Sequence, residues 1–338
     1  MSIHQKTRWH FPAFLSRSRR TVSEKQASDQ PRRWLIPHRR FFFWVSTALI
    51  TIGAGVYVRA EIHRRVSRIG GISPINIAYS GGTLLIAGGG QLPEQIRQRF
   101  VDLAGGHDAK IVVIPAESIN EQSRIQYRDS WSMYDVKSVD VLYAESRTQA
   151  DDPDFSRVLK TATGVWLGGG KQAWLAAWYG RTRVESRLKE LLARDGVIGG
   201  TSAGAAVMSR VMIASGRDQP TMGQGFDLIP GAVIDQHFIK RNRMNRLQTV
   251  LEHHPDLIGF GIDEGTALQY GVENGRFQVL GQSSVVACVM RKSAENEKHP
   301  KLHLQFLNPG DESNVEQLRR GDPIPPRFTD FESILLGE

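Results

Sequence analysis

The sequence predicts an α/β fold: a mostly parallel β-sheet with helices on both faces, preceded by one N-terminal transmembrane helix. Two patterns lead to this prediction. Through the body of the 338-residue chain, short apolar runs alternate with amphipathic stretches of helical period, an order typical of parallel sheets. Nearer the N-terminus, residues 41–58 contain no charged residue and are long enough to cross a membrane as a helix.

The expected strands are short apolar runs bounded by glycine-containing or polar segments. They cover residues 83–87, 110–115, 138–143, 164–167, 197–199, 232–236 and 258–262. Helices are expected over 92–103 and 181–194, where apolar residues recur every three or four positions. Glycine clusters follow three of these strands, and active sites of such folds lie at the carboxyl ends of the strands.

Charge and hydropathy divide the chain into a basic tail (1–40), a membrane anchor (41–58), a linker (59–75), a folded domain (76–300) and a C-terminal strand and extension (301–338). The tail holds ten lysines and arginines against two acidic residues, which accounts for the whole net charge of +8. The rest is therefore near neutral, and nucleic acid is not expected as a partner.

The basic tail also predicts the topology of the anchor. Lysine and arginine collect on the cytoplasmic side of membrane spans, so the folded domain is expected on the non-cytoplasmic side, periplasmic or extracellular. No A-x-A cleavage site follows the span, which favours an uncleaved anchor. A buried core helix is the alternative interpretation of 41–58. Cys288 is the only cysteine, which excludes an intrachain disulfide and a zinc–thiolate site.

A serine between glycines supplies the first candidate for chemistry. Gly200, Ser202 and Gly204 have the G-x-S-x-G spacing of a nucleophile elbow, in which glycines allow a sharp turn between strand and helix. A small residue at an ordinary strand–helix junction is the alternative, and the pattern alone does not separate the two.

Two further strand ends carry the partners that such a serine needs. His237 follows strand 232–236, and Asp263 and Glu264 follow strand 258–262. Serine, histidine and carboxylate at the ends of different strands are what a Ser-His-acid relay requires. Their order along the chain differs from that of α/β-hydrolases, which predicts another superfamily.

With these motifs the chain resembles the cyanophycinases and related aspartyl dipeptidases, serine peptidases on a flavodoxin-like fold similar to class I glutamine amidotransferases. The resemblance extends over residues 77–290. It is carried by AGGG from Ala87, LGGGKQ from Leu167, GTSAGA from Gly200, DQHF from Asp235 with three spaced arginines after it, and GIDEGTA from Gly261.

The resemblance implies a serine exopeptidase that needs no cofactor or metal, and the uncharged span 41–58 would anchor it in a membrane. Ser202 would be the nucleophile, His237 the general base and Glu264 the acid that orients the imidazole. The backbone N–H groups of Ala203 and of Gly169 or Gly170 would form the oxyanion hole. Substrate-binding roles are implied for Gln172, Asp235, Gln236, Arg241, Arg243 and Arg246.

The implied substrate is cyanophycin, a polyaspartate with arginine on each β-carboxyl, cleaved to β-Asp-Arg. Two residues depart from the family pattern: Lys171 replaces the usual Asp or Asn before Gln172, and Gly265 replaces the Asn after Glu264. Other β-aspartyl or isoaspartyl peptides, α-aspartyl dipeptides and an inactive binding protein on the same fold remain alternatives. A homodimer is also left open.

Overall fold

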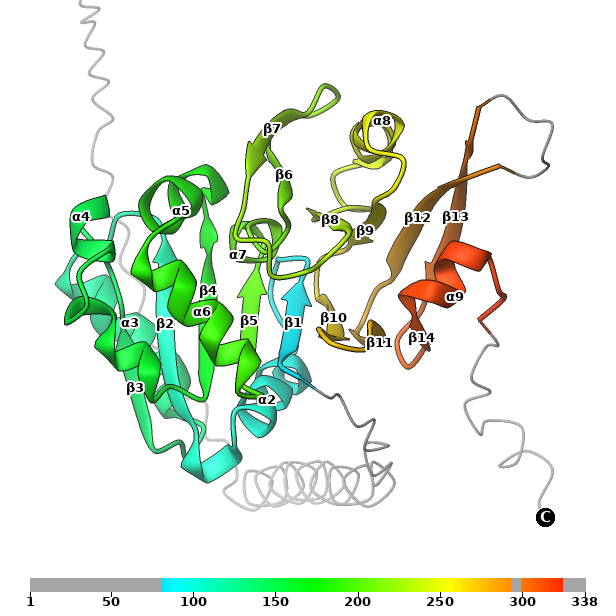
Figure 1. Ribbon diagram of the computed structural model, residues 1–338. Coiled ribbons are helices and arrows are strands. Elements are labelled where there is room, and N and C mark those ends of the chain that lie inside the picture. Colours follow the sequence, from blue (N-terminus) through cyan, green and yellow to red (C-terminus); the bar gives the residue numbers. More distant parts are fainter. Residues whose placement is uncertain (1–80, 293–298, 325–338) are drawn as a thin grey trace, which may run out of the picture. The chain divides into compact units, whose positions relative to one another are not determined.

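The computed structural model describes residues 81–292 and 299–324, all of which belong to a compact unit of residues 77–338 (Figure 1). The predicted tail, membrane span and linker, residues 1–75, lie outside the described residues. Within the described ranges, no helix has both the length and the apolar character needed to span a bilayer.

The larger sheet is mixed and mainly parallel. Five parallel strands lie in the spatial order β3, β2, β4, β5, β1, and three antiparallel strands extend the sheet beyond β1 in the order β10, β11, β14. The bounds are β1 Thr83–Ala87, β2 Lys110–Ala116, β3 Ser138–Val141, β4 Gly164–Gly170, β5 Val197–Thr201, β10 Thr266–Gly271, β11 Arg276–Gly281 and β14 Glu312–Asn314. The predicted mostly parallel sheet is confirmed in this general form, with an antiparallel extension that the sequence analysis did not predict.

Helices cover both faces of this sheet, because apolar side chains alternate along its strands. In β1, Leu84 and Ile86 join one apolar cluster while Leu85 and Ala87 join another. The first cluster includes residues of α4, α5, α6 and α7, and the second includes residues of α2 and α3 (Figure 1). The bounds are α2 Glu94–Leu103, α3 Glu121–Ser132, α4 Arg147–Ala150, α5 Gln172–Tyr179, α6 Arg183–Ala193 and α7 Ala203–Ala206.

A second sheet of four strands contains two of the strands expected in the first. Its order is β13 (Lys301–Leu307), β12 (Val285–Arg291), β9 (Ile258–Ile262) and β8 (Ala232–Gln236), with only β8 and β9 parallel. The bounds of β8 and β9 match the prediction, but their assignment to a single sheet was wrong. An apolar run reports that a strand is buried and does not report which strand it pairs with.

Packing against this second sheet depends on residues without side chains. A Cβ atom at Gly259 would lie 3.0 Å from Leu247 and Leu251 of α8 (Met244–His253), and one at Gly261 would lie 2.4 Å from the Phe238 ring. The glycines therefore let α8 and the loop before it lie close to β9. On the C-terminal side, helix α9 spans Val315–Arg320, and 3₁₀ turns cover Gly106–Asp108 and Phe155–Lys160.

A separate hairpin lies beside β8. Its strands are β6 (Val211–Ser215) and β7 (Thr221–Gln224), and they pair only with each other among the described strands. Ile213 of β6 joins the apolar cluster that contains Val233 of β8 and Phe238. Figure 1 shows the hairpin extending past α7, between α5 and α8.

Candidate active site

Ser202 lies on a sharp turn between β5, which ends at Thr201, and α7, which begins at Ala203. Its φ of 53° and ψ of −106° are rare for a residue with a side chain and typical of a nucleophile elbow. The Ser202 N–H donates to the carbonyl of Ala87, 3.0 Å away. A Cβ at Gly204 would lie 2.1 Å from the Leu167 carbonyl oxygen, so glycine allows α7 to start against β4.

The structure brings the predicted serine, histidine and glutamate into one hydrogen-bonded chain. Ser202 Oγ lies 2.8 Å from Nε2 of His237, and His237 Nδ1 lies 2.6 Å from Oε1 of Glu264. Ser202 follows a strand of the larger sheet, His237 follows β8 of the second sheet, and Glu264 lies in the turn from β9 to β10, which connects the two sheets.

Of the two acidic residues after β9, only Glu264 reaches the imidazole. The carboxylate of Asp263 is buried and accepts hydrogen bonds of 2.9 Å from the Lys240 N–H and from the Ser283 hydroxyl. Asp263 therefore fixes the loop that follows His237, while Glu264 is left to bind the ring.

Gly88, Gly89 and Gly90, to which the sequence analysis gave no role, lie against His237 and Glu264. A Cβ at Gly89 would lie 2.4 Å from Cε1 of His237, and one at Gly90 would lie 2.9 Å from Cβ of Glu264. The carbonyl of Gly88 accepts the His237 N–H at 2.8 Å. The usable signal in the sequence was a run of three glycines directly after a strand.

Two of the residues predicted to form the oxyanion hole, Ala203 and Gly169, lie next to Ser202. Ala203 is the first residue of α7, and the first N–H groups of a helix have no partner within it. A Cβ at Gly169 would lie 3.8 Å from Cβ of Ser202, whereas one at Gly170 would press on the Ala116 carbonyl at 2.7 Å. Of the two predicted glycines, Gly169 is thus the one that adjoins the serine.

The comparison with protein families decides the family of the chain. Residues 83–280, more than half of the chain, match the family described as Peptidase family S51. The chain belongs to peptidase family S51. It is therefore a member of a family of serine hydrolases, and the resemblance inferred from the motifs is confirmed.

Relatives with known names support the same family. The chain is 32% identical to a cyanophycinase of Synechococcus elongatus, over 78% of this chain and 90% of that protein. It is 35% identical to a cyanophycinase of Geminocystis herdmanii, over 61% of this chain and 80% of that protein. A solved peptidase from an acI-B1 Actinobacterium has a similar fold, with a TM-score of 0.54 at 24% identity, covering 70% of this chain and 98% of that one.

The surroundings of His237 favour the neutral form of its imidazole. His237 is 7% exposed, and its burial lowers the pKa of the imidazole below the ordinary value. The hydrogen bond that the ring donates to Glu264 raises that pKa, while the charges of Arg241 and Arg243 lower it. A neutral imidazole is the form that accepts a proton from a serine hydroxyl.

Gly265, one of the two departures from the family pattern, lies at a left-handed backbone position. Gly265 has a φ of 65°, and its N–H donates to the Gly89 carbonyl at 3.0 Å. Glycine and asparagine are the residues that enter this left-handed region most readily. The asparagine usual in the family and the glycine of this chain therefore suit the same turn, and the exchange removes only a side-chain amide.

The predicted substrate-binding residues fall into an accessible and a buried group. Arg241 is exposed, and its N–H donates to the His237 carbonyl at 3.0 Å; Gln172 is half-buried and donates from Nε2 to the Ile213 carbonyl at 2.9 Å. Asp235, Gln236 and Arg246 are buried. The prediction that all six contact substrate stays a prediction.

The buried Asp235 binds two of the predicted arginines. Arg246 donates from Nε to Oδ2 of Asp235 at 2.7 Å and from Nη2 to Oδ1. Arg243 Nη1 approaches the same Oδ1 at 3.5 Å and donates to both oxygens of Gln236, the backbone carbonyl and the side-chain amide. Burial and the Arg246 charge lower the pKa of Arg243 to about 10, while the Asp235 charge raises it.

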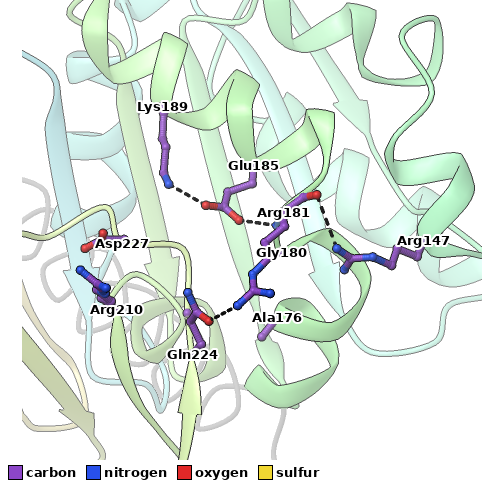
Figure 2. A pocket seen from close by; sticks show the side chains of 10 residues that line it. Arg147, Ala176, Gly180, Arg181, Glu185, Lys189, Arg210, Gln224 and Asp227 are labelled. Atoms are coloured by element: carbon purple, nitrogen blue, oxygen red, sulfur yellow. Dashed lines mark hydrogen bonds and ion pairs between the residues drawn. The ribbon is translucent and has the colours of Figure 1, made fainter.

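A second group of charged residues lines a surface pocket of about 550 Å³, shown in Figure 2. Glu185 accepts from Lys189 Nζ and from the Arg181 N–H, both at 2.6 Å, and the Arg181 guanidinium donates to Gln224 at 2.6 Å. None of the predicted site residues lines this pocket. It is therefore separate from the serine, histidine and glutamate described above.

Proposed function

We propose that this chain is a serine exopeptidase that hydrolyses β-aspartyl peptide bonds, with cyanophycin as its substrate. The observation that carries the proposal is the continuous hydrogen-bonded chain from Ser202 through His237 to Glu264, with Ser202 on a sharp turn at a positive φ. The names of the cyanophycinase relatives support the substrate class.

In the proposed reaction, Ser202 Oγ attacks the scissile carbonyl while its proton passes to Nε2 of His237. The Ala203 and Gly169 N–H groups stabilise the negative oxygen of the tetrahedral intermediate. His237 then returns the proton to the leaving amine, which leaves an ester on Ser202. Water hydrolyses the ester, with His237 again accepting the proton. Glu264 holds the imidazole in one tautomer throughout.

The substrate has free carboxylates and guanidinium groups near the scissile bond. Arg241 is exposed, and its backbone N–H donates to the His237 carbonyl, which supports its role in binding a substrate carboxylate. Lys171 is also exposed and lies at the start of α5, beside Gly170. A cation at this position supports carboxylate binding and disfavours a guanidinium beside it.

The substrate proposal is tested by comparing β-linked and α-linked peptides. Purified protein is incubated with cyanophycin, with β-linked and with α-linked aspartyl dipeptides, and the products are quantified by mass spectrometry. We expect release of β-Asp-Arg from cyanophycin, with Ser202→Ala inactive. Cleavage restricted to α-aspartyl dipeptides would contradict the substrate class and retain the peptidase. Binding of cyanophycin without cleavage of any peptide would favour the inactive binding protein.

We also propose that residues 41–58 anchor the enzyme with its folded domain outside the cytoplasm. The sequence of the basic tail and of the uncharged span supports this proposal. An alkaline phosphatase fused after Glu338 is expected to be active in cells, and a fluorescent protein that folds only in the cytoplasm is expected to stay dark there. The opposite pattern would contradict the orientation.

A further inference from the structure

A closed loop of chain carries His237, and a buried ion pair closes it. Asp235 lies at the end of β8, two residues before His237, and Arg246 lies in the first turn of α8. The Asp235 side chain is 0% exposed and that of Arg246 is 3% exposed. Their two parallel hydrogen bonds join the two ends of the segment 235–246, with His237 inside it.

The same arginine also binds the neighbouring hairpin. Arg246 Nη1 donates to the carbonyl of Gly216, the residue that follows β6. Gln172 at the start of α5 binds the same hairpin through the Ile213 carbonyl at 2.9 Å. Since β6 and β7 pair only with each other among the described strands, these two side chains help to fix the hairpin beside the elbow and the base.

The burial of Asp235 and Arg246 and their mutual hydrogen bonds limit what they can bind. Both Asp235 oxygens accept hydrogen bonds from arginines, and all three guanidinium nitrogens of Arg246 donate to Asp235 or Gly216. A substrate group that took either partner would leave the other charge buried and unpaired. That penalty exceeds the gain from one new charge-assisted hydrogen bond.

We propose that Asp235 and Arg246 are positioning residues, which hold His237 and the hairpin β6–β7 in register with Ser202 and do not contact the substrate. This inference rests on the proposed function, because it takes Ser202 and His237 as the reacting pair. It differs from the roles implied by the family resemblance, in which both residues belong to the substrate pocket.

The two roles predict different results with a reagent that has no carboxylate or guanidinium. A small uncharged fluorophosphonate reacts with an activated serine without using a pocket for acidic peptides. If Asp235 and Arg246 position the base, their loss slows this labelling and lowers kcat, with KM little changed. If they bind substrate, their loss raises KM and leaves labelling at the wild-type rate.

The experiment measures labelling rate, kcat and KM for Arg246→Met, Arg246→Lys, Asp235→Asn and the double variant Asp235→Leu/Arg246→Met, at temperatures well below each unfolding midpoint. The double variant replaces the pair by apolar side chains, a change that commonly preserves folding. Arg210→Met is the matched control, an exposed arginine of the surface pocket.

We expect labelling of the double variant and of Arg246→Met to fall by about tenfold or more, as small displacements of reacting groups do. Arg246→Lys, which keeps one ion pair, is expected to recover part of the rate, and Arg210→Met to label like the wild type. Wild-type labelling rates in a folded double variant, together with a raised KM, would overturn the positioning role. Absence of labelling in the wild type would instead contradict the proposed function.

Discussion

Two groups of charged residues in this chain contain ion pairs of similar length, but one group is buried and the other lies at the surface. Beside the base, the Arg246 and Asp235 side chains are 3% and 0% exposed and meet at 2.7 Å. In the pocket of Figure 2, Lys189 and Glu185 are 47% and 12% exposed and meet at 2.6 Å. Each pair therefore holds a short hydrogen bond, and distance alone does not distinguish the two groups.

Burial decides the difference between the groups. Exposed ion pairs contribute about 0–1 kcal/mol, because water and salt already stabilise each charge. Removing one partner of a buried pair costs about 3–5 kcal/mol, since the other charge is left without water. A single charge-assisted hydrogen bond contributes only about 1.5–3 kcal/mol. The first group is therefore expected to act as structure and the second as solvated surface.

The largest expected effect is on stability, from Arg246→Met. We expect the free energy of unfolding to fall by about 3–5 kcal/mol, measured by urea titration followed by circular dichroism on a fragment of residues 77–338. The double variant Asp235→Leu/Arg246→Met is expected to recover most of this loss. A loss below about 1 kcal/mol in the single variant would show that the pair behaves like the one in the surface pocket.

The same glycine-to-alanine change can be compared at a crowded position beside His237 and at an open position elsewhere. Gly89→Ala would put a methyl group 2.4 Å from the His237 ring at a φ of 109°, and we expect kcat to fall by about 100-fold or more. Gly310→Ala has a comparable φ of 94° with nothing within 4 Å. It is expected to keep kcat, and equal losses in both variants would contradict the contact with the imidazole.

The pH dependence tests the charge of Arg241 on the base. Burial already lowers the pKa of His237, and Arg241 lowers it further. Without this cation the imidazolium is favoured, so Arg241→Ala is expected to move the acid limb of the labelling rate to higher pH. High salt should move the wild-type profile in the same direction, because Arg241 is exposed. A shift to lower pH would contradict the assignment of His237 as the titrating group.

The smallest effect is expected in the surface pocket. Lys189→Met removes the Glu185 partner and should change the free energy of unfolding by less than about 1 kcal/mol. The same urea titration measures it. A loss of 3 kcal/mol or more would remove the contrast between the two groups.

The residues at the strand ends were predicted better from the sequence than the elements that surround them. Ser202, His237 and Glu264 were all named from motifs, and the structure places them within hydrogen-bonding distance. The hairpin β6–β7 was not predicted, because its second strand, Thr221–Gln224, has no buried residue and so no apolar run. Strands β8 and β9 had the right bounds and the wrong sheet.

Burial of charged residues was the main property that the sequence did not reveal. Asp235, Arg243 and Arg246 have the composition of a solvated or ligand-binding segment. Only the return of α8 onto the end of β8 brings Arg246 onto Asp235 and removes both from water. The spacing of the arginines along the chain does not reveal the contact between Arg246 and Asp235, because the two residues lie on different elements, α8 and β8.

The central claim, that His237 activates Ser202, is tested most directly by fluorophosphonate labelling with the modified residue mapped by mass spectrometry. We predict that the wild type carries one adduct, on Ser202, that Ser202→Ala carries none, and that His237→Ala reacts at least about 100-fold more slowly. Equal labelling of the wild type and Ser202→Ala, or an adduct on another residue, would contradict the claim.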